Sequence, residues 1–427
     1  MNIVIANAAA IMDNGMQVVP FPSRWDSAVP QVLFRWYPYE LALLSTLLKR
    51  ELPDATVRLL DGNIANWNGD RYAAEIYRLK PDVLVCECSA LTYSTMTRVM
   101  QAVHPKRAIL CGPMATYAGA HLDGWTDTVV GEYEHKVLSL LRGEPEPIGY
   151  IDLDWLPWPE DEDIDRGAYY EINHYTPPAV PQIYATRGCP LACTFCVVPS
   201  YYGGHGKSHR SHRCRSVENV CDEIEYLVKL GPTKGWQFTG AFFNDEAHNA
   251  STEWFVAFCE ELIRRGLNRY AYDAMCGMWP FTTELVKLAA RAGYRQIRFG
   301  VESTSEVVGK QIKKSLHVEK LEQFMGWLKQ HGVGGYSTIQ VGAPGSTEAT
   351  DLQTLTDLRR WIREGKIQKW QVSTSTPQPN TPFWDLCKKN GWLVTENLNY
   401  FNGYNALVNY PDYPAERVQF VRNTAGL

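Results

Sequence analysis

The sequence lacks long apolar runs and an excess of positive charge. No stretch of the 427 residues reaches the roughly 18 to 20 consecutive apolar residues of a membrane-spanning helix, so we expect no membrane segment. The net charge of −5 argues against binding of nucleic acid or an anionic membrane by overall electrostatic attraction. Residues 1–16 have no basic residue ahead of the apolar run and therefore lack the pattern of a signal peptide.

Short repeats, low-complexity tracts and a regular cysteine framework are also absent. The 11 cysteines are clustered without regular spacing, which favours a metal site in a reducing compartment over a disulfide scaffold. Apolar residues make up 45% of the chain, enough for sizeable cores in two domains. Together these features predict a soluble cytoplasmic protein.

Strand-like and helix-like segments take turns about five times over residues 1–147. This alternation predicts an α/β domain with a doubly wound, Rossmann-like parallel sheet. The expected strands include 2–7, 56–62, 81–89 and 107–113. Ligands of such sheets bind beyond the carboxyl ends of the strands. The candidate binding residues there are Ser89, Leu91, Thr92, Tyr93, Gly112, Gly131 and Glu132.

A second alternating region follows a segment that we interpret as a linker, residues 148–180. Within it, residues 154–165 are rich in proline, tryptophan and acidic residues and show no sustained period. Six strand–helix repeats over 181–385 suit a partial (β/α)6 TIM barrel, which has fewer repeats than the complete eightfold barrel. Residues 386–427 are too short for another domain, and we expect this tail to pack near the barrel opening.

The segment RGCPLACTFC, residues 187–196, places Cys189, Cys193 and Cys196 within eight positions, directly after an expected strand. Three thiolates on a four-iron cluster leave one iron open to an exogenous ligand. The alternatives are a zinc site completed by Cys214 or His205, or three incidental cysteines. The spacing differs from the paired cysteines of zinc modules, which favours the cluster.

This motif resembles the signature of radical S-adenosylmethionine (SAM) enzymes, in which an aromatic residue, here Phe195, precedes the last cysteine. Further segments resemble the same family in the same order, and the resemblance covers nearly the whole chain. They are FNDE at 243–246, GVES at 300–303, the turn at 341–350 and the closing element at 376–393, which has Asn380 where glycine is common. The resemblance implies a [4Fe-4S] cluster on Cys189, Cys193 and Cys196, with SAM on the open iron.

Strand alternation divides the residues around GVES between two faces. Ile297, Phe299 and Val301 share one face, and the polar face, with Arg298, Gly300 and Glu302, should line the barrel. From this pattern and the resemblance, Glu302 is the candidate for the ribose hydroxyls of SAM, together with Ser303.

Other candidates for SAM contacts rest on charge and on the resemblance. Arg298 is the candidate for the carboxylate, and Asp245 and Glu246 for the α-ammonium group. The alternative for these charged residues is a set of buried ion pairs in the barrel interior. Phe195 is expected to pack on the adenine, or else to fill core.

Residues 37–63 and the later elements of the amino-terminal region resemble the cobalamin-binding domain that precedes many radical SAM barrels. The family's Gly-Gly-x-His-x-Thr segment appears here in altered form at 112–116. An Asp-x-His-x-x-Gly sequence is absent. The resemblance therefore implies base-off cobalamin with no histidine ligand and with its tail toward Ser89, Leu91, Thr92 and Tyr93. A degenerate domain without the cofactor is the alternative.

Cys86, Cys88 and Cys111 raise the possibility of a second cluster, as in the methylthiotransferase branch of the family. The small RNA-binding domain of that branch is not found in this sequence, and apolar strands often bury free cysteines.

The basic segment 203–216 contains three histidines, one lysine and three arginines. It is either a site for an anionic substrate or a solvated loop, and Arg215 in it is a candidate structural residue.

The function that the resemblance implies is methylation of an unactivated carbon or phosphorus centre through a 5′-deoxyadenosyl radical and methylcobalamin. The alternatives are a cyclase or rearrangement enzyme without methyl transfer, a methylthiotransferase-like enzyme, and a non-enzymatic cobalamin or iron–sulfur carrier or sensor. The expected partners are a small-molecule or peptide substrate and an external electron donor such as flavodoxin or ferredoxin.

Overall fold

The structure is a computed structural model that describes residues 1–12, 15, 17, 34–118, 124–171, 181–203, 211–314 and 316–425. The chain forms two compact units. The amino-terminal unit comprises residues 1–171, 197–209 and 397–402, and the barrel unit comprises residues 172–196, 210–396 and 403–427. The predicted boundaries at 147, 180 and 385 therefore do not coincide with the boundaries of these units.

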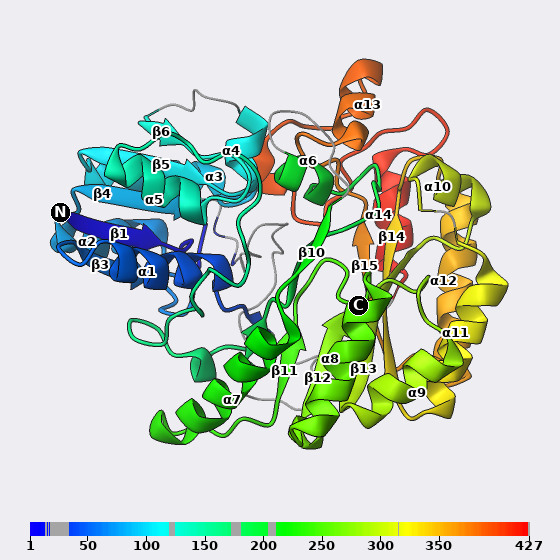
Figure 1. Ribbon diagram of the computed structural model, residues 1–427. Helices are drawn as coiled ribbons and strands as arrows, with labels where there is room; N and C mark the ends of the chain where they lie inside the picture. The colour runs from blue at the N-terminus through cyan, green and yellow to red at the C-terminus, as the bar shows by residue number, and fades with distance from the viewer. Residues whose placement is uncertain are drawn as a thin grey trace. The chain divides into compact units, whose positions relative to one another are not determined.

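The amino-terminal unit is built on a five-stranded parallel sheet in the order β3-β1-β4-β5-β6. This is the flavodoxin-like arrangement of a doubly wound sheet, as predicted. Helices α1 and α5 contact each other, as do α2 and α3, and Figure 1 shows these pairs flanking the sheet. The elements are β1 Asn2–Ala6, α1 Tyr39–Glu51, β3 Thr56–Leu60, α2 Gly69–Leu79, β4 Val83–Glu87, α3 Tyr93–Val103, β5 Arg107–Cys111, α4 Pro113–Ala118, β6 Asp127–Thr128 and α5 Glu134–Arg142.

Part of the predicted linker is folded onto this unit. The carboxylate of Glu160 accepts a hydrogen bond from Ser45 at 2.9 Å and pairs with Lys49. The carboxylate of Asp163 accepts the backbone N–H of Leu59 at 2.9 Å. Glu160 and Asp163 therefore bind the segment to α1 and β3, and the segment is an integral part of the unit. Residues 172–180 lie outside the described residues.

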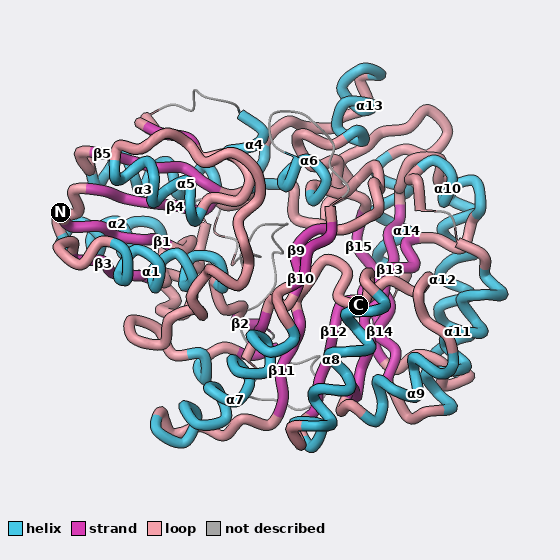
Figure 2. The backbone as a smooth tube through the Cα atoms, viewed as in Figure 1, coloured by secondary structure: helices cyan, strands magenta, loops and turns pink. Residues whose placement is uncertain are grey.

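The barrel unit contains a six-stranded parallel sheet in the order β15-β14-β13-β12-β11-β8. Each strand neighbours the next along the sheet, as the predicted partial (β/α)6 barrel requires. Figure 2 shows these strands side by side, with helices outside them. The strands are β8 Gln182–Ile183, β11 Gly240–Phe243, β12 Ala271–Met275, β13 Tyr294–Glu302, β14 Gly334–Val341 and β15 Lys369–Thr374. The helices between them are α7 Val217–Thr233, α8 Thr252–Arg264, α9 Thr283–Arg291, α10 Glu306–Gln311, α11 Val318–Gln330 and α12 Glu348–Arg363.

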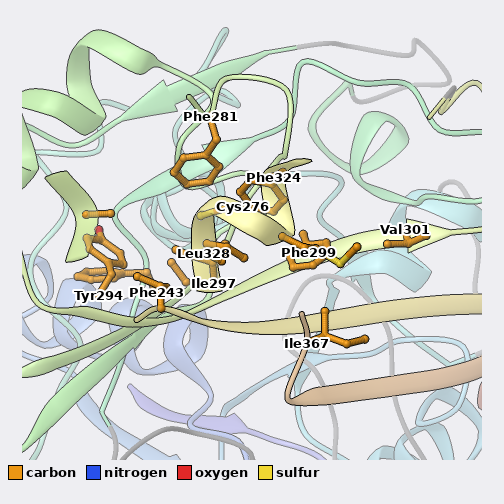
Figure 3. Close-up of a cluster of buried hydrophobic side chains, with 14 of the residues drawn as sticks. Phe243, Cys276, Phe281, Tyr294, Ile297, Phe299, Val301, Phe324, Leu328 and Ile367 are labelled. Atoms are coloured by element: carbon orange, nitrogen blue, oxygen red, sulfur yellow. The ribbon is translucent and has the colours of Figure 1, made fainter. Parts of the chain in front are cut away.

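The two faces of β13 separate as strand alternation predicts. Ile297, Phe299 and Val301 belong to the main hydrophobic core, and Figure 3 shows them following one another along the strand. Arg298 and Glu302 are also buried but are not members of that core. The polar barrel interior expected from the sequence is confirmed.

The segment 182–188 forms two short strands where the sequence predicts one. β8 pairs with β11, whereas β9, Thr186–Gly188, turns away to pair antiparallel with β10, His212–Cys214. The break falls at Tyr184 and Ala185. The backbone N–H groups of Ala185 and Thr186 are taken by the side chain of Asp245, so they are not available to a continuous ladder.

The carboxyl-terminal tail contributes helices α13, Pro382–Asn390, and α14, Ala415–Asn423. Val418 and Val421 of α14 belong to the core of the barrel unit. Tyr410 donates its hydroxyl to Gly342 O at 3.1 Å, so the tail packs on the turn after β14. No helix of the described residues is long and apolar enough to cross a membrane.

Asp351 holds that same turn from the first part of α12. Its carboxylate accepts the backbone N–H of Gly342 at 2.7 Å. Burial raises the pKa of Asp351 to about 6, although the hydrogen bond from the Gly342 N–H opposes the rise. Because the folded pKa lies above the unfolded value, the ionised carboxylate costs stability above pH 6, and the cost declines as the pH falls toward 4.

We expect Asp351→Asn to remove this pH dependence. The amide oxygen can still accept the Gly342 N–H, but the side chain no longer ionises. The difference in unfolding free energy between the variant and the wild type should therefore change by about 1 kcal/mol between pH 5 and pH 7.5, with the variant gaining at the higher pH. Chemical denaturation at the two pH values measures this, and a pH-independent difference would contradict it.

Candidate functional site

The carboxyl ends of the barrel strands carry the polar residues that the sequence singles out. The cysteine loop follows β9, Glu246 follows β11, and Glu302 ends β13. Lys314 comes shortly after α10, the helix that follows β13. Since β11 and β13 are parallel, Glu246 and Glu302 lie at one edge of the sheet. The charges of Glu246 and Lys314 act on the Cys189 thiol, so the cysteine loop lies beside them at the mouth of the barrel unit.

The cysteine loop is pinned through its backbone. Thr194 N–H donates to Ile312 O at 3.0 Å, and Thr194 O accepts the N–H of Phe383 at 2.9 Å. Cys193 is buried, whereas Cys189 and Cys196 are partly exposed, and none of the three is in a disulfide. The loop therefore has a fixed middle between two partly exposed cysteines.

Burial raises the pKa of Cys189 to about 11 and also raises that of Cys193, although Lys314 opposes the rise in both thiols. The thiols of Cys189 and Cys193 are therefore protonated near neutral pH, and a metal must displace those protons when it binds. Lys314 favours the thiolate form that results.

The arrangement suits a cluster better than a single ion. Among the described residues, no three His, Cys, Asp or Glu side chains meet as one zinc ion requires. Cys214 lies 3.8 Å from His212 Nδ1 on β10, and His205 lies outside the described residues. In a four-iron cluster each thiolate binds its own iron, so the sulfurs surround the cluster without converging on one atom. The donor set fits a [4Fe-4S] cluster.

Asp245 and Glu246 hold the stem of this loop. Asp245 Oδ1 accepts the N–H groups of Ala185 and Thr186 at 2.9 and 3.0 Å. Glu246 Oε2 accepts the N–H of Gly188 at 2.9 Å. Asp245 is completely buried and anchors the stem, and its contact with the α-ammonium group of SAM stays a prediction. Glu246 is partly exposed and remains a candidate for that contact.

Arg298 forms a buried ion pair, which is the alternative considered from the sequence. Its Nε donates to Asp273 Oδ2 at 2.8 Å. Its guanidinium also lies over the rings of Phe242 and Tyr336, 4.1 and 5.0 Å from their centroids. Its charge is balanced by Asp273 inside the barrel, so Arg298 is not the cation best placed for a substrate carboxylate.

The cation at the mouth is Lys314, which sequence reasoning did not select. Its Nζ donates to Glu302 Oε1 at 2.7 Å, and Gln340 Nε2 donates to Glu302 Oε2 at 3.0 Å. A Cβ atom on Gly300 would lie 2.4 Å from Lys314 Nζ, so glycine makes room for the pair. The available signal was a lysine twelve positions after the glutamate of GVES.

Ser303 and Phe195 both contact other parts of the barrel unit. Ser303 Oγ lies 3.3 Å from Thr354 Oγ1 of α12. Phe195 is half-buried and packs against the small cluster of Val308, Ile312 and Ala343. The core-filling alternative for Phe195 is thus present, and its exposed part leaves the adenine contact a prediction.

In the amino-terminal unit, the loop after β4 folds on itself. Thr92 Oγ1 accepts the N–H of Ser89 at 3.0 Å, and Ser89 O accepts the N–H of Tyr93 at the start of α3. Ser89, Leu91 and Thr92 are buried, and Tyr93 is half-buried.

The two candidate glycines at the same edge of this sheet have φ values of +85° at Gly112 and +77° at Gly131, so both adopt a conformation that favours glycine. Glu132, which follows Gly131, is buried.

Histidine is absent from the described residues of the loops that follow the five strands of this unit, and His135 lies in the first turn of α5.

The cysteines of this unit lie in its core. Cys86, Cys88 and Cys111 are completely buried, and the Cys111 thiol donates to Cys86 O at 3.2 Å. Burial raises the pKa of Cys86 and of Cys111. The alternative considered from the sequence, that apolar strands bury free cysteines, is thus present.

Residues 204–210 of the basic segment lie outside the described residues. Arg215, at its end, donates to Glu223 at 2.6 Å and to Tyr184 O at 3.1 Å and is buried. The prediction that Arg215 is structural is confirmed.

Comparison with known families decides between the classes of protein that this site allows. Residues 183–358 match the model of the Radical SAM superfamily. The chain therefore contains a radical SAM domain. The matched segment begins in β8 and ends in α12, and so includes the cysteine loop, Glu246, Glu302 and Lys314.

Two curated relatives illustrate the range of this family. The chain is 25% identical over 404 residues to an anaerobic magnesium-protoporphyrin IX monomethyl ester cyclase of Rubrivivax gelatinosus, covering 85% of this chain and 68% of the relative. It is 30% identical over 274 residues to a cytidylyl-2-hydroxyethylphosphonate methyltransferase of Streptomyces wedmorensis, covering 61% of this chain and 48% of the relative.

Among solved structures, the radical SAM methyltransferase TsrM of Kitasatospora setae, with cobalamin and a [4Fe-4S] cluster bound, has the same fold. The TM-score is 0.66 with 16% identity over 92% of this chain and 79% of TsrM. The cobalamin-dependent SAM radical enzyme OxsB matches with a TM-score of 0.66 and 14% identity, over 99% of this chain and 65% of OxsB. The fold of this chain is therefore that of cobalamin-dependent members.

Gly188, next to Cys189, tests the stem of the cysteine loop. It has a φ of +87°, and a Cβ atom there would lie 2.1 Å from Ser211 O. We expect Gly188→Ala to separate β9 from β10 and to leave less than about half of the wild-type iron after reconstitution. Iron and sulfide analysis of the purified protein measures this.

Gly266→Ala is the matched control for this substitution. Gly266 also has a positive φ, +66°, but nothing lies within 4 Å of its Cβ position. Equal iron content in the two variants would contradict the prediction.

Proposed function

We propose that this enzyme is a cobalamin-dependent radical SAM enzyme that transfers a methyl group to an unactivated carbon or phosphorus centre. The observation that carries the proposal is one chain in which a radical SAM barrel follows a flavodoxin-like unit, with a fold like that of TsrM over 92% of its length. When bound, the cluster supplies the electron that cleaves SAM, and cobalamin supplies the methyl group that is transferred.

Cys189, Cys193 and Cys196 would hold the cluster. For SAM, we assign the α-ammonium to Glu246 and the ribose hydroxyls to Glu302 and, by its hydrogen bond to that carboxylate, Gln340. Charged and bidentate contacts of this kind fix the orientation of a substrate as well as its affinity.

Lys314 replaces Arg298 as our candidate for the SAM carboxylate. The Arg298 charge is already balanced by Asp273, and exchanging one buried carboxylate for another would gain little. Lys314 lies where it favours the thiolates of Cys189 and Cys193, and an ammonium with three donors can serve Glu302 and a second carboxylate together.

Cobalamin would lie at the carboxyl edge of the sheet of the amino-terminal unit. Ser89, Leu91, Thr92 and Tyr93 would face its tail, and the turns at Gly112 and Gly131 would face the corrin together with Glu132. The described loops that follow the strands contain no histidine, so the cofactor would be base-off without a histidine ligand from them. A substrate, either a small molecule or a peptide, and an external donor such as flavodoxin or ferredoxin complete the system.

A second candidate function is cyclisation or rearrangement with the same cofactors and no methyl transfer. It is favoured by the relative from Rubrivivax gelatinosus, a cyclase that matches 85% of this chain. The two functions differ in the fate of the methyl group of SAM, so they can be separated by labelling.

The test uses anaerobically reconstituted holoenzyme with hydroxocobalamin, methyl-labelled SAM and a strong reductant. We expect cobalamin to remain bound after desalting with a base-off spectrum, and both 5′-deoxyadenosine and S-adenosylhomocysteine to form. Retained cobalamin with 5′-deoxyadenosine alone would favour the cyclase. 5′-Deoxyadenosine without retained cobalamin would exclude the proposed methyl transfer.

Lys314→Met tests the carboxylate site. Loss of one charge-assisted hydrogen bond is expected to weaken SAM binding to the holoenzyme about 10- to 100-fold. Lys313→Met is the control, because Lys313 is an exposed neighbour of the same charge. Equilibrium binding of SAM measures the effect. If the two variants bind SAM with equal affinity, Arg298 again becomes the candidate for the SAM carboxylate.

A further inference from the structure

A chain of three buried side chains ends on the carboxylate that anchors the cysteine-loop stem. Tyr294 Oη lies 2.6 Å from His248 Nε2, and His248 Nδ1 lies 2.6 Å from Asp245 Oδ2. All three side chains are completely buried. They cannot contact a substrate directly, so any effect on the reaction passes through the loop that Asp245 holds.

The two ends of the chain limit its hydrogen-bond directions. Burial raises the pKa of Tyr294 well above its usual value, so the phenol keeps its proton. The carboxylate of Asp245 can only accept, so His248 Nδ1 donates to it, and His248 Nε2 bonds to the Tyr294 hydroxyl. The second oxygen of that carboxylate accepts the N–H groups of Ala185 and Thr186. Every polar atom named in this chain has a partner.

The surroundings of His248 are aromatic. Its ring stacks on Phe243, with centroids 4.6 Å apart and 16° between the planes, and Phe255 and Phe258 meet it edge-on. Figure 3 shows Phe243 and Tyr294 close together in this core. An imidazole in such a place is costly unless both nitrogens are bonded. The two hydrogen bonds are therefore the physical reason that histidine, and not another aromatic ring, suits this position.

We propose that His248 and Tyr294 are positioning residues for the iron–sulfur loop. They fix the Asp245 carboxylate in the one orientation that holds Ala185 and Thr186, three to four residues before Cys189. The segment before Cys189 in turn determines the position of the cysteine loop. This inference rests on the radical SAM assignment and not on cobalamin or methyl transfer, so the two can fail separately.

Four single variants separate hydrogen bonding from packing. His248→Phe keeps an aromatic ring on Phe243 but removes both nitrogens. His248→Asn loses the ring but keeps an N–H donor near the Nδ1 position. Tyr294→Phe removes only the hydroxyl at the far end of the chain. Tyr272→Phe is the matched control, because Tyr272 is equally buried, pairs with Tyr294 in register and donates its hydroxyl to Leu267 O instead.

The first readout is hydrogen–deuterium exchange of the Ala185 and Thr186 amides, and it needs no activity. We expect about tenfold or faster exchange at these two amides in His248→Phe and a smaller increase in Tyr294→Phe. His248→Asn should restore exchange close to the wild-type rate, and Tyr272→Phe should leave it unchanged. If His248 only filled space in the core, His248→Phe would keep exchange of these amides close to the wild-type rate and His248→Asn would speed it up.

The second readout is the electron paramagnetic resonance spectrum of the reduced holoenzyme with and without SAM. We expect a broadened cluster signal with a smaller SAM-induced change in His248→Phe, and rescue in His248→Asn. A wild-type spectrum in His248→Phe, or a Phe variant closer to wild type than the Asn variant, overturns the proposal. If His248→Phe does not fold, the exchange rates of the Ala185 and Thr186 amides are compared between Tyr294→Phe and Tyr272→Phe. Identical rates in these two variants refute the proposal.

Discussion

The catalytic end of this enzyme depends on the carboxylate of Asp245 and the backbone N–H groups it accepts. These two bonds, from Ala185 and Thr186, end the pairing of β8 with β11 and let the chain turn into β9. Glu246 adds the N–H of Gly188 one step further along. A charged acceptor on a backbone donor is among the stronger hydrogen bonds in a protein interior, so the stem has little freedom. The cysteine loop begins at the next residue.

Arg298 and Lys314 of the barrel unit have different surroundings. Arg298 is paired with Asp273 and lies over aromatic rings, so its charge is balanced by a residue of the neighbouring strand and links the two strands. Lys314 is paired with Glu302, whose other oxygen is bonded to Gln340, at the end where the cysteines lie. The first pair stabilises the barrel around it, and the second has donors that a ligand can share. This division follows from depth in the barrel and not from residue type, because either cation can bind a carboxylate.

The amino-terminal unit shows how composition can be misread. The acidic, proline-rich segment 154–165 has no sustained period and therefore favours a linker, yet Glu160 and Asp163 bind to α1 and β3 and make it part of the unit. Likewise Cys86, Cys88 and Cys111 are compatible with a second cluster in sequence, but they are sealed in the sheet core. In both cases a polar or reactive residue has a partner that is distant in the chain, which no local pattern can reveal.

The sequence by itself determined the class of fold and the chemistry of the loop. Regular alternation of strands and helices implies parallel sheets, and the two-residue period of β13 is enough to send Ile297 and Phe299 to the core and Arg298 to the other face, whereas Glu302 follows a shift in strand register and has a φ of +63°. The cysteine spacing is local and implies a cluster with an open iron. Only the tertiary structure decided which charged groups meet: Asp245 with Ala185, Arg298 with Asp273, and Lys314 with Glu302. These pairs depend on strand register and on the depth of each residue in the barrel, since a shift of one residue would turn a side chain to the opposite face.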